Sequence, residues 1–311
     1  MRVLSLGSSS SGNALLIEAG PHRRTKILID AGLPARILID HLRQAGSHPS
    51  QLQAIFITHE HSDHIIGLPS LMKRYAIPLI TAPETLTAIE RCMGSGMLDV
   101  DMDVSINVDL TSPGTTTYQE PWNTQNSMTA LEARVPLPAG SHYTIGDITV
   151  TSFPVSHDAA SPCGYLLSAS GCRVCIVTDT GEVTPTMLDM MRHADLLVLE
   201  SNHDRERLVR GPYPYILKQR ILSPTGHLSN DQAADAVLRT WRADSVRWLW
   251  LAHLSRTNNT PKVALQSMLT NLEAAHANLA QIHVSVLPPG MGKMWDSTLL
   301  WHEPSLWEME L

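Results

Sequence analysis

Four side chains of metal-ligand type occur within six positions of this chain, in the order His59, His61, Asp63 and His64. Imidazole and carboxylate groups are ligands that zinc, manganese and iron accept. The group directly follows an apolar, strand-like run at 52–58. Alternate residues of an extended chain point the same way, so His59 and His61 can hold one ion, whereas Asp63 and His64 can reach a second where the chain turns. Placing four such side chains so close together costs free energy unless a cation balances them, so the pattern predicts a metal site.

Three further residues of ligand type, His157, Asp179 and His253, also follow apolar, strand-like runs. Sheets of α/β proteins place ligand sites at the carboxyl ends of their strands. We therefore expect these residues to join the first group in a two-metal centre, which needs more than four ligands. Each one alone has a structural alternative, since Asp179-Thr-Gly can be a simple turn. Their shared position after a strand favours the metal site.

The elements that must position these residues fall into two similar halves of strands and helices. Three early strand-like runs separated by Gly and Ser turns predict a meander. Residues of about 94–141 are rich in Gly, Ser, Thr, Asn and Pro, which predicts an insertion or cap. Apolar spacing predicts strands at 3–6, 14–18, 26–30, 52–58, 77–81, 143–153, 164–168, 173–178, 196–200, 246–252 and 281–287, and helices at 34–45, 69–75, 83–92, 184–192, 215–221, 230–241 and 261–275.

The composition excludes several classes of protein. With 311 residues, 43% hydrophobic and 17% charged, the chain is neither disordered, collagen-like nor coiled coil. It contains no run of ~18 apolar residues, so no membrane-spanning helix is expected, and its N-terminus reads as a strand and is too brief for a signal peptide. Four cysteines in such a long chain favour a reducing cytoplasm. Cys172 and Cys175 lie in a strand-like run that points their thiols to opposite faces, which argues against a metal or redox pair.

The net charge of −7 restricts how a phosphate-bearing substrate can be held. A protein that binds nucleic acid through a broad electrostatic surface is normally basic. In this acidic chain the phosphate groups must therefore be bound by metal ions or by a local basic patch. Such a patch occurs in one run, where Asp204 and Glu206 interrupt the basic residues Arg205, Arg207, Arg210, Lys218 and Arg220. We expect Arg210 to contact phosphate and Tyr213 to stack on bases, as Tyr215 also could; both tyrosines could instead simply pack. A solvated helix face is the alternative interpretation of this run.

These motifs resemble the metallo-β-lactamase superfamily, and within it the YycJ/WalJ-type branch, whose members are taken as phosphodiesterases with DNA exonuclease activity. The resemblance implies a four-layer αββα sandwich of two β-rich halves, with the site at the sheet edges. It also implies a single domain at 1–290 and a C-terminal extension at 291–311. We expect this extension, which contains Trp295, Trp301 and Trp307, to pack on the surface or at an interface. Besides the ligand series, the resemblance rests on Gly7–Asn13, Ile29–Gly32, Phe153–Ala159, Leu199–Asp204, Gly211–Pro214, Gly226–Asn230 and Leu251–Ser255.

The resemblance further implies two divalent metal ions, with zinc or manganese expected first and iron as an alternative. Asp30, at the end of its strand, would orient the histidine loop. The ligands carried over from the family pattern are His59, His61 and His157 for one ion, Asp63, His64 and His253 for the other, and Asp179 between the two.

Such a centre predicts hydrolysis of a phosphodiester. Two cations lower the pKa of a shared water towards ~7 and neutralise a phosphate oxygen during attack, and Asp63 counts among the catalytic residues as well as the ligands. The leaving alkoxide needs a proton, for which His227 is the best acid. Glu200 can hold that imidazole in the right tautomer, as a comparable pair does in tRNA-processing members of the superfamily. His203, Ser255 and Asn258 are further expected substrate contacts.

The preferred substrate is DNA, but the sequence leaves alternatives open. A small cyclic phosphodiester, or a thioester or lactone, can be hydrolysed on the same fold. The predicted acid His227 favours phosphate, since an ester hydrolase has less need of one. A redox di-iron protein is disfavoured because it usually has a carboxylate where His61 stands, and a non-catalytic module is disfavoured by the complete ligand set. Members of this fold often form dimers, so a homodimer is one partner that the resemblance allows.

Overall fold

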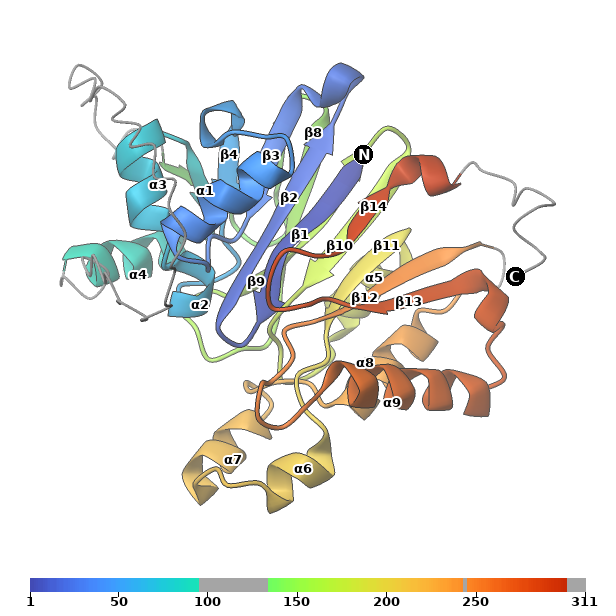
Figure 1. Cartoon of the computed structure of the whole chain (residues 1–311). Helices are drawn as coiled ribbons and strands as arrows, with labels where there is room; N and C mark the ends of the chain where they lie inside the picture. Colours follow the sequence, from blue (N-terminus) through green and yellow to red (C-terminus); the bar gives the residue numbers. More distant parts are fainter. Residues whose placement is uncertain (95–133, 243–244, 301–311) are drawn as a thin grey trace, which may run out of the picture.

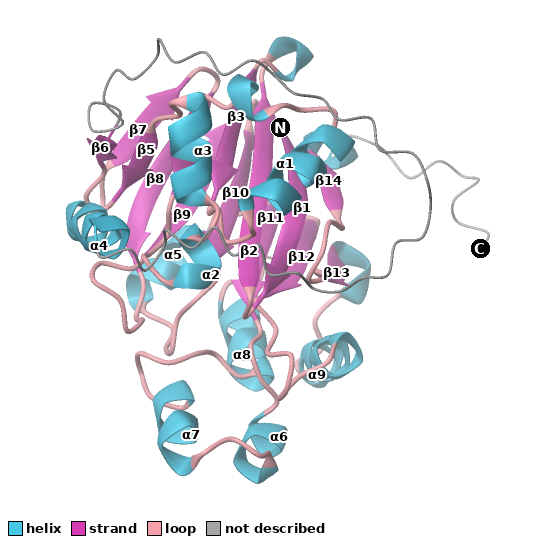
Figure 2. Ribbon diagram, turned by 60° about the vertical axis from the view of Figure 1, so that its left-hand side comes forward, coloured by secondary structure: helices cyan, strands magenta, loops and turns pink. Residues whose placement is uncertain are grey.

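The computed structural model describes residues 1–94, 134–242 and 245–300. Within these ranges the strands form two seven-stranded sheets that pack face to face, and helices cover both outer faces (Figures 1 and 2). The αββα sandwich predicted from the sequence is therefore confirmed. No helix of the described ranges combines the length and the apolar character needed to cross a membrane.

The first sheet has the strand order β14-β1-β2-β3-β4-β5-β6. Its first three strands form the expected antiparallel meander, and β3, β4, β5 and β6 then run parallel to one another. The bounds of its strands are β1 (Arg2–Ser9), β2 (Gly12–Ala19), β3 (Thr25–Ile29), β4 (Ala54–Phe56), β5 (Leu79–Thr81), β6 (Arg134–Pro136) and β14 (Met294–Asp296).

The second sheet repeats this plan in the order β13-β12-β11-β10-β9-β8-β7. Its antiparallel part runs from β7 to β10, and β10 to β13 are parallel. The bounds of its strands are β7 (His142–Ile145), β8 (Ile148–Pro154), β9 (Cys163–Ala169), β10 (Cys172–Val177), β11 (Leu196–Glu200), β12 (Arg247–Ala252) and β13 (Ile282–Val286).

The helices fall into three groups (Figures 1 and 2). Those on the outer face of the first sheet are α1 (Ala35–Gln44), α2 (Ser62–Ile65), α3 (Leu68–Tyr75) and α4 (Pro83–Gly94). Those on the second sheet are α5 (Pro185–Arg192), α8 (Asn230–Arg239) and α9 (Pro261–Ala274). The remaining pair, α6 (Arg205–Arg210) and α7 (Tyr215–Ile221), projects away from both sheets.

Three apolar clusters hold these four layers together. One lies between the sheets, where Phe56 of β4 meets Tyr165 of β9 edge to face, with ring centroids 5.7 Å apart. The other two lie between each sheet and its helices. Because most strands are buried on both faces, they read as continuous apolar runs in the sequence.

The strand directions bring the predicted ligands to one edge of the sandwich. Strand β4 ends just before His59, and β10, β11 and β12 are parallel and end at Val177, Glu200 and Ala252. Strand β8 lies antiparallel to β9, which lies antiparallel to β10, so the segment leading to His157 leaves the sheet at the same end. Parallel strands therefore deliver side chains from distant parts of the sequence to a common place.

Several sequence expectations differ from the structure in detail. The insertion expected at 94–141 lies mostly outside the described residues, but β6 falls within that range and pairs with β5. Within the expected extension at 291–311, β14 pairs with β1. Trp295, in the tail that was expected to pack on the surface or at an interface, is only 1% exposed and lies in the cluster between the sheets. Trp301 and Trp307 lie outside the described residues.

The prediction that Cys172 and Cys175 lie on one strand with their thiols on opposite faces is confirmed. Cys172 lies in the cluster between the sheets, whereas Cys175 lies in the cluster beneath the helices, so their thiols face opposite sides of β10. Burial raises the pKa of the Cys175 thiol to about 12, which keeps it protonated and unreactive at neutral pH.

We expect the edge strand β14 to contribute strongly to stability. Trp295→Ala should lower the free energy of unfolding by about 3–5 kcal/mol, because it empties a large buried site. Met294→Ala on the same strand is the matched control, since that side chain is 57% exposed, and it should cost about 0.5 kcal/mol or less. Urea denaturation followed by circular dichroism measures both. Equal losses in the two variants would show that β14 is held by its backbone alone.

Candidate metal centre

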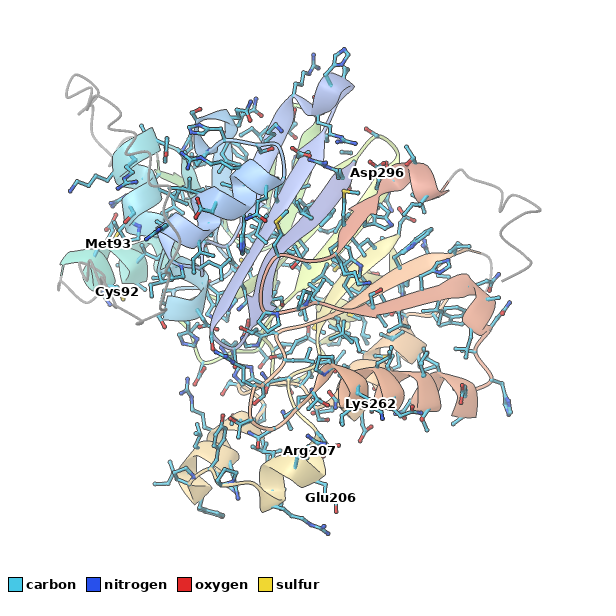
Figure 3. The ribbon with its side chains drawn as sticks, viewed as in Figure 1. Cys92, Met93, Glu206, Arg207, Lys262 and Asp296 are labelled. Atoms are coloured by element: carbon cyan, nitrogen blue, oxygen red, sulfur yellow. The ribbon has the colours of Figure 1, made fainter. Side chains whose placement is uncertain are left out.

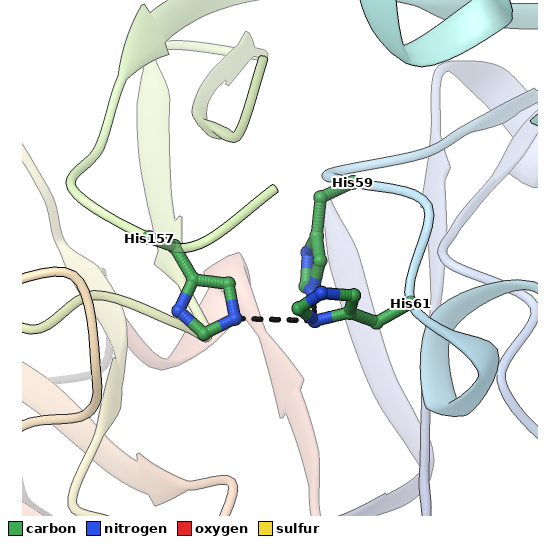
Figure 4. A group of neighbouring side chains, drawn as sticks. All are labelled: His59, His61 and His157. Carbon is green, nitrogen blue, oxygen red and sulfur yellow. Dashed lines mark hydrogen bonds between the residues drawn. The ribbon is translucent and has the colours of Figure 1, made fainter. Parts of the chain in front are cut away.

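Three imidazoles converge at the edge of the sandwich (Figure 4). His59 and His61 come from the loop after β4, and His157 comes from the loop after β8. The Nδ1 atom of His61 lies 3.1 Å from Nε2 of His59 and 3.2 Å from Nε2 of His157. Tetrahedral ligands at ~2.0–2.1 Å from a zinc ion are separated by roughly 3.3 Å. The spacing of the three nitrogens therefore fits a single ion between them.

A second group of donors lies beside the first. Asp63 Oδ2 is 3.2 Å from Nε2 of His253 and 3.5 Å from Nε2 of His64. Asp179 lies next to both groups, with Oδ2 3.1 Å from His64 Nε2 and Oδ1 3.9 Å from His157 Nε2. The donor atoms of each group lie within 4.8 Å of one another. The structure thus brings all seven predicted ligand residues to one place.

The outer ring nitrogens of the histidines are already bound by protein oxygens. This leaves the Nε2 atoms facing the centre, which is the usual arrangement around a metal ion. The contacts are His59 Nδ1 to Thr58 Oγ1 (3.0 Å), His64 Nδ1 to Asp30 Oδ2 (2.8 Å), His157 Nδ1 to Gly226 O (3.0 Å) and His253 Nδ1 to Glu200 Oε1 (2.9 Å). His61 differs, since it turns Nδ1 towards the other two imidazoles.

The electrostatics of the site favour a bound cation. Burial opposes ionisation, yet the His253 and His64 imidazoles hold the pKa of the Asp179 carboxyl well below its usual range. Burial likewise opposes charge on His253, but neighbouring carboxylates, Asp179 foremost, raise its pKa to about 10. The carboxylates thus favour the charged form of His253 and also raise the pKa of His64, whereas burial lowers the pKa of His59. A divalent ion would balance the same negative charge and release the protons from His64 and His253.

One buried oxygen supports this conclusion directly. Oδ2 of Asp179 accepts no hydrogen bond of acceptable geometry from any described residue, although His64 Nε2 lies 3.1 Å away. A buried carboxylate oxygen without a partner is costly unless something else satisfies it. The donor set, its spacing and this oxygen together fit a metal ion.

The backbone is strained at two positions of the site. Asp30 and His253 have φ values of 60° and 53°, in a region that costs side-chain-bearing residues about 1–3 kcal/mol each. His253 is held there by two hydrogen bonds, because its N–H donates to Ser8 Oγ and its carbonyl accepts from Asn202 Nδ2, both at 3.0 Å. Asp30 is held by Thr58, whose backbone N–H donates to Oδ1 at 2.8 Å.

Gly32 explains why the motif after β3 ends in glycine. A Cβ atom at this position would lie 1.6 Å from the carbonyl oxygen of Asp63. Only glycine therefore lets the loop after β3 pack against the histidine loop. This close approach allows Asp30 to reach His64.

The contact expected between His227 and Glu200 is present beside the candidate ligands. His227 Nδ1 lies 2.7 Å from Glu200 Oε1, and Glu200 Oε2 accepts hydrogen bonds from the backbone N–H groups of Thr180 and Leu228. Burial disfavours a charged imidazole, but the Glu200 carboxylate raises the pKa of His227 above its ordinary value. The Nδ1 atom of His227 is also 3.5 Å from Asp179 Oδ1, so the pair adjoins the ligands.

The expected substrate contacts lie in different surroundings. Arg210 and Tyr213 belong to the projecting α6–α7 segment, where Arg210 is exposed and Tyr213 is half-buried. His203, Ser255 and Asn258 are instead buried. Neither ring nitrogen of His203 and neither amide atom of Asn258 has a hydrogen-bond partner among the described residues. Burial lowers the pKa of His203 to about 4, so this imidazole is neutral at physiological pH.

Sequence reasoning did not single out several polar residues that support the ligands. Asn13 places Nδ2 3.3 Å from His64 Nε2, Thr58 lies between Asp30 and His59, and Asn202 holds the backbone of His253. Uncharged side chains give no distinctive signal of their own. The hint in the sequence is their position, because Asn13 and Asn202 lie within the family motifs at 7–13 and 199–204 and Thr58 directly precedes His59.

Comparison with known proteins agrees with this geometry. Residues 25–247 match the family described as beta-lactamase superfamily domain. The exodeoxyribonuclease WalJ of Streptococcus pneumoniae is 34% identical over 270 residues, which cover 87% of either chain. The exodeoxyribonuclease YycJ of Bacillus anthracis is 34% identical over 268 residues, 86% of this chain and 88% of the relative.

Solved structures share the fold at lower sequence identity. The metallo-β-lactamase fold protein YhfI of Bacillus subtilis has a TM-score of 0.63 and 15% identity, covering 94% of this chain and 98% of its own. Zinc-bound PqqB of Methylobacterium extorquens has a TM-score of 0.61 and 16% identity, covering 95% of this chain and all of its own. With its sequence matches and its two-sheet architecture in agreement, the chain belongs to the family of the beta-lactamase superfamily domain and has the metallo-β-lactamase fold.

Proposed function

We propose that this protein is a metal-dependent phosphodiesterase that digests DNA from an end. The observation that carries the proposal is the Glu200–His227 pair beside Asp179, because it adds a proton donor to a set of metal ligands. The 34% identity to proteins named exodeoxyribonucleases, over most of both chains, supports the same substrate.

Two divalent ions, zinc or manganese, are proposed as cofactors. His59, His61 and His157 would hold one, and the second would be held by the group containing Asp63, with Asp179 shared. When bound, such ions supply a water that is acidic enough to attack at neutral pH and positive charge for the phosphate oxygens. Among the three aspartates proposed for the centre, the Asp63 side chain is 22% exposed, against 3% for Asp179 and 2% for Asp30. We therefore assign contact with the attacking water to Asp63.

The chain's own residues would manage the leaving group. Glu200 holds Nδ1 of His227, so the opposite ring nitrogen, Nε2, is left to donate a proton to the departing alkoxide oxygen. The raised pKa of His227 favours the protonated ring that this role requires. Glu200 in turn is fixed by the backbone N–H groups of Thr180 and Leu228, which prevents its carboxylate from rotating.

The other substrates considered are less well supported. A thioester hydrolase would have less use for the Glu200–His227 pair, because a thiolate leaves without a proton. A lactone expels an alkoxide and so needs a proton, but neither substrate explains the basic segment around Arg210. A small cyclic phosphodiester needs the same acid and is the second candidate. The arginine-containing segment around Arg210 favours the longer polyanion, as does the identity to the two exodeoxyribonucleases.

Cellular location and the remaining contacts follow from this assignment. We place the activity in the cytoplasm, where chromosomal DNA of bacteria lies, and the buried thiols Cys163, Cys172 and Cys175 fit a reducing environment. Arg210 and Tyr213 are proposed to meet the strand outside the centre. His203, Ser255 and Asn258 are proposed to meet it only where the covering loops separate, because all three are buried.

Metal binding tests the shared role of Asp179. Chelator-stripped protein titrated with zinc or manganese in a calorimeter should bind two ions per chain. Asp179→Asn should weaken binding about 100-fold or more, because it removes charge from a residue that both groups share. Asp189→Asn, an exposed carboxylate on α5, is the matched control and should leave the titration unchanged. Full occupancy in Asp179→Asn would refute the assignment.

Digestion of nucleic acids tests the substrate. Metal-loaded protein incubated with end-labelled single-stranded DNA, duplex DNA and RNA should release short products progressively from the ends of DNA, and Asp179→Asn should release none. Product lengths on denaturing gels distinguish this from internal cutting. Cleavage of RNA alone, or internal cleavage of DNA from the outset, contradicts the proposal.

The role of His227 predicts a dependence on the leaving group. His227→Ala should slow DNA cleavage by about 100- to 10,000-fold, since the deoxyribose alkoxide needs a proton. Hydrolysis of bis-p-nitrophenyl phosphate should fall by less than about 10-fold, because nitrophenolate leaves without one. Steady-state rates on both substrates provide the comparison, with exposed His142→Ala as the control. Equal losses on both substrates would show that His227 has a structural role only.

A further inference from the structure

A projecting arm, defined here as residues 204–229, leaves the body at the end of the sandwich that carries the metal centre. It contains α6 and α7, which lie apart from both sheets in two views (Figures 1 and 2). Its two ends meet at a parallel bridge between His203 and Ser229, and the Asn230 N–H donates to the His203 carbonyl at 2.9 Å. The arm therefore leaves and rejoins the body of the protein at neighbouring positions.

The returning part of the arm is fixed to the loop that carries His157. Arg220 Nε donates to Asp158 Oδ2 at 2.5 Å, and Ser156 Oγ donates to the Pro224 carbonyl at 2.9 Å. The backbone of the arm also packs against the loop after β10, because a Cβ at Gly181 in that loop would lie 2.4 Å from the carbonyl oxygen of Pro224. The returning part of the arm therefore lies next to the loop that carries His157.

The tip of the arm exposes apolar side chains. Ile216 and Tyr215 are 82% and 75% exposed, and they are the two most exposed large apolar side chains of the described residues. Val209, on α6, is 52% exposed. Tyr215 and Ile216 are consecutive at the start of α7, and the preceding Gly-Pro-Tyr-Pro segment at 211–214 restricts the backbone through its prolines. Exposed apolar side chains grouped on a stiff segment mark a surface that binds something.

The charge of the arm identifies a polyanion as that partner. The arm carries five cationic and two anionic side chains, a net charge of +3 in a chain of −7. Arg210 pairs with Glu206 within α6, but Arg205 and Arg207 form no ion pair with any described residue. Figure 3 shows Arg207 and Glu206 on α6, at the end of the molecule farthest from the sheets. Two arms meeting in a dimer would bring like charges together, which disfavours a second copy of the chain.

We propose that the arm binds single-stranded nucleic acid, with Tyr215 and Ile216 packing against unpaired bases while Arg205 and Arg207 contact phosphates. This inference rests on the proposed function and names the form of substrate that the centre receives. Exposed bases offer flat faces for aromatic and apolar side chains, whereas a duplex offers them only at its ends. The arm would hold the strand beside His157 before cleavage.

Binding and hydrolysis can be measured separately to test this. A fluorescent single-stranded phosphorothioate oligonucleotide, which resists cleavage, is titrated with the full metal-loaded chain and followed by anisotropy. The double variant Tyr215→Ala/Ile216→Ala should bind about 10-fold more weakly or worse, since stacking on a base is lost. Its turnover of bis-p-nitrophenyl phosphate should be unchanged. Replacing Tyr215 by tryptophan instead of alanine, in the variant Tyr215→Trp/Ile216→Ala, should restore the affinity for the oligonucleotide.

The control variant removes exposed apolar side chains elsewhere. Ile37→Ala/Met294→Ala changes residues on α1 and β14 that are also exposed, and it should bind the oligonucleotide as the wild type does. Arg205→Ala/Arg207→Ala should reduce the dependence of affinity on salt, because fewer phosphate contacts release fewer ions.

Two results would contradict the inference about the arm, and a different result would contradict the proposed function. Unchanged affinity in Tyr215→Ala/Ile216→Ala overturns the inference. Light scattering gives a second test. If the wild type is a dimer, and Tyr215→Ala/Ile216→Ala is a monomer that binds DNA as tightly, then Tyr215 and Ile216 contact a second copy of the chain and the inference is again overturned. If the wild type binds the oligonucleotide through Tyr215 but hydrolyses no phosphodiester, the arm is supported and the proposed function fails.

Discussion

The attraction between buried carboxylates and imidazoles at one edge of two sheets is the constraint on which the structure depends. Asp30, Asp63 and Asp179 lie among histidines that are themselves buried, and each charge is costly unless an opposite charge is close. Neither sheet alone supplies both kinds of group in sufficient number. The sandwich must therefore close before these side chains can compensate one another.

A layer of uncharged polar groups keeps this cluster in order. Thr58 and Asn202 contact the ligand residues from behind, and backbone N–H groups hold Glu200. Ligands that are fixed in advance lose little freedom when an ion arrives, which strengthens binding. The positive φ of His253 shows that the fold accepts local strain to point this imidazole inwards.

The ligand grouping could be predicted from the sequence because it follows a topological rule. His59, Asp179 and His253 each follow an apolar run, and parallel strands of one sheet end at the same edge. That His59, after a strand of the first sheet, meets the other two, after strands of the second, depends on how the sheets pack, and it was expected from the family resemblance. The Glu200–His227 contact was within reach for the same reason, as Glu200 ends a strand. Buried elements such as β11 were also clear, since their apolar runs are long enough to be distinctive.

The remaining features depend on neighbours that a linear pattern does not reveal. Strand β14 is three residues long, so its pairing with β1 and the burial of Trp295 follow from tertiary packing and not from periodicity. Helix α6 has only six residues, too few to show a helical repeat. The support given by Asn13 and Asn202 likewise arises from contacts across about fifty positions of sequence. The exposure of Tyr215 and Ile216 could be learned only from the arm's place in three dimensions.

The distribution of donors along the chain also has a consequence for biosynthesis. The groups are separated by 190 positions between Asp63 and His253, and the last of them follows β12, the sixth strand of the second sheet in chain order. A polypeptide still emerging from the ribosome therefore lacks a complete set until β12 has left the exit tunnel and paired with β11. Contacts of such long range form late and slowly in folding. A hydrolase built in this way acquires its full set of candidate ligands only late in synthesis, after both sheets have begun to form.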